Sequence, residues 1–106
     1  MTEAEECIDV RDLPESGRFE IWVDGVRAGL TSYADMGAER TFPHTEIDAV
    51  YGGRGLAKRV VREALDATRS AGLYVIPRCS MVSDFIRKNP DYADLVPSNR
   101  HAEFGL

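Results

Sequence analysis

The sequence has few cysteines, no long apolar run and no excess of basic residues, and each absence excludes a class of protein. Its two cysteines, Cys7 and Cys79, form neither a disulfide framework nor a metal-binding pair, which favours a reducing compartment. No segment is apolar enough to cross a membrane, and the acidic start lacks the pattern of a secretory signal. The net charge of −5, from 13 Lys and Arg against 18 Asp and Glu, argues against binding nucleic acid or anionic lipid. We expect a cytoplasmic protein without a metal site, a nucleic-acid partner or a membrane partner.

The composition that is present is that of a soluble globular domain. Hydrophobic residues make up 43% of the chain and charged residues 29%, which are ordinary proportions. A chain of 106 residues is long enough for one domain with its own core, and no repeat or linker divides it. We therefore expect a single domain over residues 1–106, a monomer or weak dimer, with an ordered core at about 8–96 and a loose polar tail at 97–106.

Alternating apolar and polar residues predict antiparallel strands in the first half of the chain. Residues 7–10 form a short edge strand in this interpretation, and residues 19–23 and 26–30 form a hairpin. The Asp24-Gly25 pair between the hairpin strands tolerates the positive φ that a two-residue turn needs. A further strand is expected at 41–50. Three aromatic residues are more typical of the core than of a ligand site: Phe19, Trp22 and Tyr74.

The second half of the chain has a long helical pattern, a strand and a shorter helix. Apolar residues and one threonine recur at helical spacing on a single stripe: Leu56, Val60, Val61, Ala64, Leu65 and Thr68. Gly72 ends this helix, residues 73–77 form a buried strand, and Ser80 caps a second helix at 81–88. The order strand, helix, strand predicts a right-handed parallel crossover. The fold class is therefore α/β (α+β), a mixed twisted sheet with antiparallel strands first and a β-loop-α-β-α unit second.

A glycine-rich loop at residues 51–58 connects the 41–50 strand to the long helix. Glycines let the backbone bend sharply, and a helix start leaves N–H groups unpaired at the positive end of the helix dipole. This combination predicts an anion site for a phosphate or pyrophosphate. The loop lacks both the Gly-Lys-Ser/Thr ending of a Walker loop and the acidic partner of a dinucleotide fingerprint. The expected binding residues are Gly53, Arg54, Gly55, Leu56, Ala57 and Lys58.

The strand before the loop has two distinct faces. Side chains alternate along it, with His44, Glu46 and Asp48 on one face and Thr45, Ile47 and Ala49 on the other. Three ionisable side chains on one face of an inner strand indicate either a solvated surface or a site of chemistry. The strand pattern alone leaves both interpretations open.

The order and spacing of these pieces resemble the GNAT superfamily of acyl-coenzyme A-dependent N-acetyltransferases. In particular, the chain resembles the minimal GNAT-like domains, which have His-Thr-Glu before the loop and Pro-x-Cys-Ser after the next strand. Those motifs fall at residues 44–46 and 77–80, and the resemblance covers roughly residues 18–96. It implies a GNAT fold, acetyl-coenzyme A as the cofactor, and transfer of an acetyl group to the amine of a small molecule or a protein lysine.

The resemblance also implies roles for individual residues. Main-chain groups around Thr45, Glu46 and Ile47 would pair with the pantetheine arm, and the loop amides would hold the pyrophosphate. Glu46 or His44 would accept the proton of the amine. Cys79 would line the thioester site, or take the acyl group covalently before its transfer. Each role has a structural alternative, namely a hydrogen-bonded pair for Glu46 with His44 and inert packing for Cys79.

Two positions depart from the superfamily pattern. Gly52 stands where a Gln or Arg is expected in the loop, and Ile86 stands where many superfamily enzymes have a tyrosine general acid. An alternative function is therefore a non-catalytic acyl-coenzyme A-binding module, such as a sensor or a protein-interaction domain. A weaker alternative is a nucleotide-phosphate binder.

Overall fold

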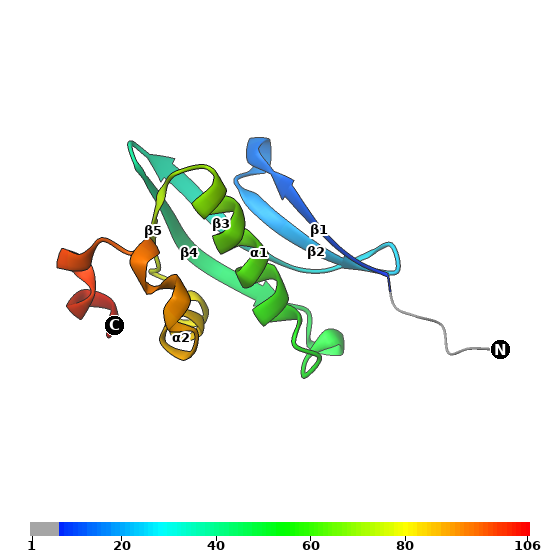
Figure 1. Cartoon of the computed structure of the whole chain (residues 1–106). Helices are drawn as coiled ribbons and strands as arrows, with labels where there is room; N and C mark the ends of the chain where they lie inside the picture. Colours follow the sequence, from blue (N-terminus) through cyan, green and yellow to red (C-terminus); the bar gives the residue numbers. More distant parts are fainter. Residues whose placement is uncertain (1–6) are drawn as a thin grey trace.

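The computed structural model describes residues 7–106, which form a five-stranded sheet and two α-helices (Figure 1). In chain order the strands and helices are β1 (Ile8–Leu13), β2 (Arg18–Val23), β3 (Val26–Met36), β4 (Glu39–Ile47), α1 (Leu56–Ser70), β5 (Tyr74–Ile76) and α2 (Ser80–Lys88). The strands lie in the order β1-β2-β3-β4-β5 across the sheet. The first four are antiparallel, and β5 is parallel to β4 after the crossover through α1. This mixed sheet confirms the predicted fold class.

The β2–β3 hairpin follows the prediction, whereas β4 ends earlier than predicted. Asp24 has φ 50° and Gly25 has φ 82°, which suits the right-handed twist of a two-residue hairpin. β4 pairs with β3 only as far as the bond from Asp48 N–H to the Ala28 carbonyl, at 2.8 Å. Residues Ala49–Tyr51 then form a 3₁₀ turn. The predicted strand at 41–50 is therefore wrong for its last residues, because the chain leaves the sheet in this turn although β3 extends to Val26.

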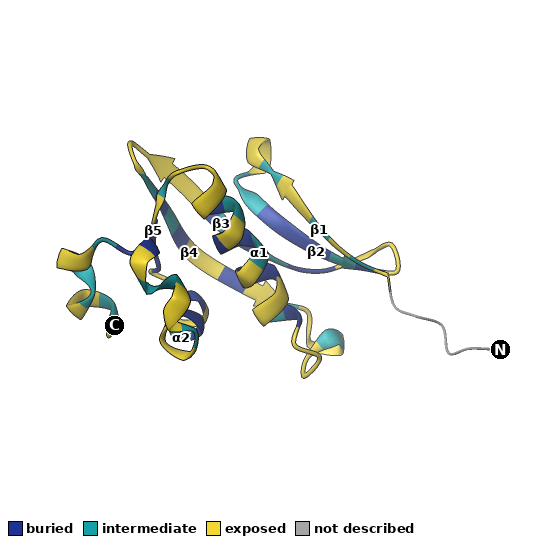
Figure 2. Ribbon diagram, in the orientation of Figure 1, coloured by how far each residue is buried: buried dark blue, intermediate teal, exposed yellow. Residues whose placement is uncertain are grey.

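Helix α1 lies across one face of the sheet and buries its apolar stripe against it (Figure 2). Its buried residues are the six that the helical spacing predicts: Leu56, Val60, Val61, Ala64, Leu65 and Thr68. Among the strand residues, Ile21, Phe42 and Val75 are completely buried in the same core. The side chains on the opposite face of the sheet do not join this core. We call that opposite surface the outer face.

Helix α2 packs beside α1 and begins one residue earlier than predicted. Cys79, not Ser80, is the N-cap, and its carbonyl accepts hydrogen bonds from the N–H groups of Val82 and Ser83, both at 3.1 Å. The helix buries Phe85 and Ile86 in the core. Neither α1 nor α2 has the length and apolarity that a membrane span needs, and the same holds for every other helix within residues 7–106.

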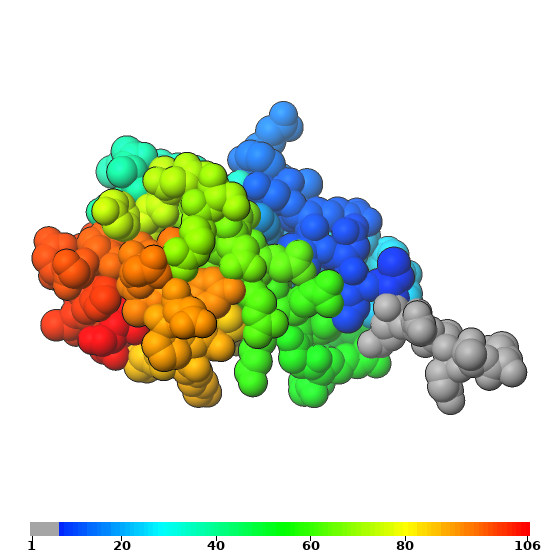
Figure 3. Space-filling view, in the orientation of Figure 1, coloured from blue at the N-terminus to red at the C-terminus, as the bar shows by residue number. Residues whose placement is uncertain are grey.

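The C-terminal segment at 97–106, which the sequence predicts as a loose tail, contacts α2 and the core in the structure. It follows a 3₁₀ helix at Pro90–Leu95 and contains two more, Ser98–Arg100 and Ala102–Phe104. Phe104 and Leu106 are partly buried against the core, and Arg87 donates a hydrogen bond to the Phe104 carbonyl at 3.1 Å. In the space-filling view the red C-terminal segment lies beside the orange part of the chain, to which the end of α2 belongs (Figure 3). Two apolar side chains, together with polar contacts such as His101 Nε2 to the Val96 carbonyl at 2.9 Å, thus hold a mainly polar segment in place.

Two of the three aromatic residues assigned to the core lie outside it. Phe19 is buried as expected. Trp22 is half-buried on the outer face, because it alternates with the core residues Ile21 and Val23. Tyr74 is 49% exposed at the start of the short edge strand β5. The alternation of β2 already separates Trp22 from its buried neighbours.

Candidate functional site

Within residues 7–106, main-chain N–H groups at the start of α1, next to the glycine loop, have no hydrogen-bond partner. Gly53 (φ 76°) and Gly55 (φ 77°) adopt the left-handed conformation that residues with a Cβ avoid. A Cβ at either position would have no atom within 4 Å, so the space beside the loop is open. The first helical bond runs from Arg59 N–H to the Gly55 carbonyl at 3.1 Å. Within residues 7–106, the N–H groups of residues 56–58 therefore have no acceptor.

Side chains around the loop add positive charge and an anchor. The Arg54 guanidinium carbon lies 5.5 Å from the centre of the Tyr51 ring, and Tyr51 packs against the core. Lys58 is exposed on the first turn of α1. The helix dipole and these cations act in the same direction, so the electrostatics of the loop favour an anion.

Strands β4 and β5 are paired over only a short length, which leaves part of β4 without a neighbour. The register between them covers residues 39–41 of β4 and 74–76 of β5, and the Cys79 N–H then bonds to the Phe42 carbonyl at 2.8 Å. Asp48 N–H and the His44 carbonyl both point to β3. Since main-chain groups alternate in direction along a strand, those of Thr45 and Ile47 point to the other edge. No strand within residues 7–106 pairs with them there.

His44 and Glu46 form a pair on the outer face of β4. The His44 Nε2 and Glu46 Oε1 atoms are 3.0 Å apart, and the two side chains are 60% and 55% exposed. Thr45 is buried and Ile47 packs against the core on the α1 side. The predicted division into two faces is therefore confirmed for residues 44–47, whereas Asp48 and Ala49 lie beyond the end of the strand. The exposed pair is open to a ligand that approaches from solvent.

Cys79 contacts β4 from the opposite side of the sheet. Its Sγ atom lies 3.4 Å from the Thr45 Oγ1, which in turn lies 2.8 Å from the Thr31 Oγ1. Thr31 is completely buried, whereas Cys79 is half-buried. The structure thus joins Cys79 to Thr45, and His44 to Glu46, with the two pairs on opposite faces of one strand. The chemical roles of these four residues stay predictions.

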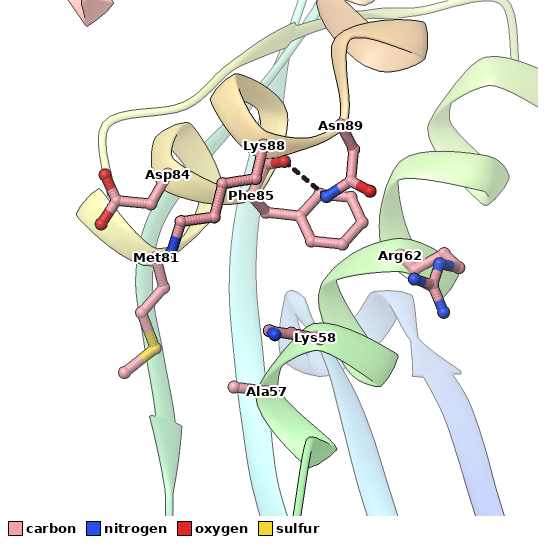
Figure 4. Close-up of a pocket in the computed structure, with 8 residues that line it drawn as sticks. All are labelled: Ala57, Lys58, Arg62, Met81, Asp84, Phe85, Lys88 and Asn89. Carbon is pink, nitrogen blue, oxygen red and sulfur yellow. Dashed lines mark hydrogen bonds between the residues drawn. The ribbon is translucent and has the colours of Figure 1, made fainter.

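A groove of about 470 Å³ lies between the start of α1 and helix α2 (Figure 4). Its lining residues are Ala57, Lys58, Arg62, Met81, Asp84, Phe85, Lys88 and Asn89. The Asn89 amide donates to the Phe85 carbonyl at 2.8 Å, which closes the end of α2. Three cations and one carboxylate are among these lining residues, so the groove continues the positive potential of the loop. Only Ala57 and Lys58 were predicted as binding residues.

The other groove residues follow a helical spacing in the sequence. This spacing indicates a groove only once the relative positions of α1 and α2 are known. Lys58 and Arg62 are four residues apart on α1, and Met81, Phe85 and Lys88 recur at helical spacing on α2. Each set therefore shares one face of its helix. The sequence alone does not show that these two faces meet.

A family model described as GCN5-related N-acetyl-transferase matches residues 18–95 of the chain, well over half of its length. The protein belongs to the GCN5-related N-acetyl-transferase family. Among solved structures, it is similar to the solution structure of a Staphylococcus aureus protein described as GCN5-like, with 20% sequence identity and a TM-score of 0.65. That alignment covers 84% of this chain and 87% of the other, which shows a shared fold. No curated protein matches the chain.

Within the GCN5-related N-acetyl-transferase fold, both departures noted in the sequence can be located. Gly52 is extended, with φ −62° and ψ 151°, and a Cβ there would come 3.2 Å from the Ala49 carbonyl oxygen. Ile86 is 1% exposed and packs in the core. A side chain at position 86 therefore faces the protein interior and not the exposed His44–Glu46 pair.

Proposed function

We propose that this protein binds acetyl-coenzyme A and transfers the acetyl group to an amine. The proposal is carried by two stretches of backbone whose hydrogen-bonding groups have no partner within residues 7–106. The amides of residues 56–58 form an anion cradle at one end, and the unpaired edge of β4 at Thr45 and Ile47 lies at the other. A pyrophosphate with an amide-containing arm needs both stretches. Family membership supports the same ligand.

The residues present fit the diphosphate part of the ligand. Gly53 and Gly55 leave open space where side chains would stand, so an anion can approach the loop amides. Lys58 and Lys88 line the adjoining groove and offer charge to the remaining phosphate of coenzyme A. The N–H and C=O groups of Thr45 and Ile47 would pair with the pantetheine amides as with an added strand.

The His44–Glu46 pair would carry out the proton transfer. An attacking amine must be neutral, and a carboxylate within hydrogen-bond reach, directly or through one water, removes its proton. When bound, the cofactor supplies the activated thioester carbonyl, and a C–N bond replaces the C–S bond as the coenzyme A thiol leaves. His44 contacts Glu46 at 3.0 Å and would hold the carboxylate in one orientation. Cys79 and Thr45 would bound the thioester from the α1 side.

The test is release of free thiol from acetyl-coenzyme A in the presence of a panel of primary amines. Glu46→Gln should lower the rate by about 10²–10⁴-fold, the usual contribution of a general base. The matched control, Glu15→Gln, removes an exposed carboxylate from the 3₁₀ turn Pro14–Ser16 and should leave the rate unchanged. Equal rates in both variants would remove Glu46 from the chemistry.

The same experiment separates the remaining alternatives. Cys79→Ala should still bind acetyl-coenzyme A, because its thiol contacts Thr45 and not the loop. If mass spectrometry finds an acetyl-protein in the wild type that Cys79→Ala lacks, transfer is covalent through the thiol. Tight binding of acetyl-coenzyme A without thiol release for any amine would instead support a non-catalytic binding module. Failure to bind at all would overturn the proposal.

A further inference from the structure

The outer face of the sheet presents an ordered set of charged side chains. Residues directly opposite one another in antiparallel strands share a face. The strand register therefore forms three rows across this face: Arg11, Glu20, Leu30 and Glu46; Arg18, Ser32 and His44; and Asp9, Trp22 and Arg27. Both α-helices of residues 7–106 lie on the other side of the sheet (Figure 1). The proposed catalytic pair thus opens onto a surface that neither α1 nor α2 covers.

Glu20 organises the middle of this surface. It is only 4% exposed although it lies on a solvent-facing side, because neighbouring side chains close over it. Its carboxylate accepts hydrogen bonds from Arg18 Nε at 2.7 Å, Trp22 Nε1 at 3.1 Å and Arg27 Nη1 at 3.4 Å. Burial alone would raise the pKa of Glu20, but these three donors outweigh it and hold the pKa below its usual range. Glu20 is therefore a fixed anion that orients two guanidinium groups.

The two arginines keep donors available for a ligand. Each guanidinium has five N–H groups, and Glu20 uses a single nitrogen of each. Their side chains remain 35% exposed for Arg18 and 47% exposed for Arg27. Two positive charges surround one negative charge, so this part of the face has a local excess of one positive charge. A pre-oriented guanidinium pair of this kind suits a carboxylate or phosphate.

The negative charge of Glu46 lies two strands away from these arginines. Glu46 is exposed on β4, Glu20 and its arginines lie on β2 and the start of β3, and the apolar Leu30 stands between Glu20 and Glu46 in the same row. Two strand spacings separate β2 from β4 by about 10 Å. An amine bound at Glu46 would therefore have an apolar surface beside it and guanidinium groups beyond that.

From this charge complementarity we infer that the amine acceptor is a zwitterion: a primary amine separated from a terminal carboxylate or similar anion by a short apolar chain. The amine binds at Glu46, the chain lies over Leu30, and the anion binds Arg18 and Arg27. With a hydrogen bond at each end, charges about 7 Å apart, as in an extended six-carbon chain, span the distance. The inference names the acceptor class of the proposed function and rests on it for the role of Glu46.

Three amines of matched length test this inference. They are 6-aminohexanoate, hexylamine and 1,6-diaminohexane, which carry a negative, a neutral and a positive far end. With acetyl-coenzyme A, the wild type should use 6-aminohexanoate about tenfold better than hexylamine in kcat/KM, the effect of one charge-assisted hydrogen bond. The diamine should be the poorest substrate, because its second ammonium meets the arginines. Equal kcat/KM for all three amines would overturn the inference.

Arginine variants identify the residues responsible. Arg18→Gln should remove the preference for 6-aminohexanoate over hexylamine, and a circular dichroism spectrum that matches the wild type should report correct folding. Arg18→Lys should keep part of the preference, because it retains the charge without the fork of donors. Arg69→Gln, which removes an exposed arginine from the far end of α1, should keep the full preference. A preference that survives Arg18→Gln and Arg27→Gln together would contradict the assignment.

A binding measurement distinguishes this inference from the proposed function. NMR titration of 6-aminohexanoate, with coenzyme A present, should shift the Leu30 methyl and Ser32 amide signals in the wild type but not in Arg18→Gln. If these shifts occur and no amine releases thiol, the acceptor site stands and the transfer reaction fails. If thiol is released and these shifts are absent, the reaction stands and the acceptor site fails. If neither occurs, both fail.

Discussion

Replacing a glycine of the loop with alanine should lower both the stability of the protein and its affinity for acetyl-coenzyme A, and the two losses can be measured separately. Gly55 has φ 77° and caps the start of α1. Gly37 has φ 60° and lies in the turn between β3 and β4. A Cβ at either position would have no atom within 4 Å, so neither substitution creates a clash. Gly55→Ala and Gly37→Ala therefore form a matched pair: both add a methyl group at a left-handed position without a clash, and only Gly55 lies beside the loop amides.

The backbone strain should be similar in both variants. An L-residue in the left-handed region costs about 1–2 kcal/mol. For a domain of this size, 1 kcal/mol corresponds to a Tm decrease of roughly 4–8 °C. Binding should respond differently, because only the Cβ of Gly55→Ala stands beside the amides of residues 56–58. Loss of one charge-assisted amide–phosphate bond should lower acetyl-coenzyme A affinity about tenfold in that variant.

Thermal unfolding by circular dichroism measures the strain, and isothermal titration calorimetry with acetyl-coenzyme A measures the affinity. We expect both variants to lose comparable stability, with an affinity loss confined to Gly55→Ala. A Gly55→Ala protein that is destabilised but binds like the wild type would show that the loop amides do not hold the cofactor. An equal loss of affinity in Gly37→Ala would also contradict this prediction, since the effect would then be a general consequence of strain.

Three further predictions concern stability. Burial and the hydrogen bond to Asp12 raise the pKa of Tyr33 to about 12. The wild type should therefore lose about 2 kcal/mol of unfolding free energy as the pH rises from 10 to 12, a loss that Tyr33→Phe should lack in urea denaturation. The Arg40 hydrogen bond holds the pKa of Asp35 below its ordinary value of 3.8, so Asp35→Asn should lower Tm at pH 7 but make little difference at pH 2. Phe42→Ala should cost about 3–5 kcal/mol in urea denaturation, because Phe42 is completely buried.

Each of these three stability predictions has a result that would contradict it. An alkaline transition that is identical in Tyr33→Phe would assign it to another group. A Tm difference for Asp35→Asn that persists undiminished at pH 2 would show that the carboxylate charge is not the cause. A loss below 1 kcal/mol for Phe42→Ala would mean that the core at this position relaxes around the missing ring.

The fold was largely predictable because its local signals agree with one another. The helical stripe of α1 predicted its buried residues, since a single helix face packs on the sheet. The Asp24-Gly25 turn predicted the first hairpin, since few residue pairs allow positive φ twice. The tail was not predictable in this way. Phe104 and Leu106 show no periodicity, and their burial depends on contact with α2, which is distant in sequence.

The candidate site was predictable in its parts but not in its arrangement. Alternation along β4 places His44 and Glu46 on one face of the strand and Thr45 on the other, and this division follows from residue order alone. Alternation does not show that Cys79 contacts Thr45 through a hydroxyl, or that Thr31 stands behind it. The groove between α1 and α2 and the arginines around Glu20 likewise depend on how distant elements are placed together. Local patterns carry no information about such contacts.

The most direct test is NMR titration of the protein with acetyl-coenzyme A, following the backbone amides. The account predicts that the amide signals of residues 53–58 shift strongly and saturably, with smaller shifts at Thr45 and Ile47. The Gly37 amide, in a comparable left-handed turn away from the site, should not move. If the signals of residues 53–58 stay in place at saturating acetyl-coenzyme A, the loop does not hold the cofactor and the proposed function is wrong.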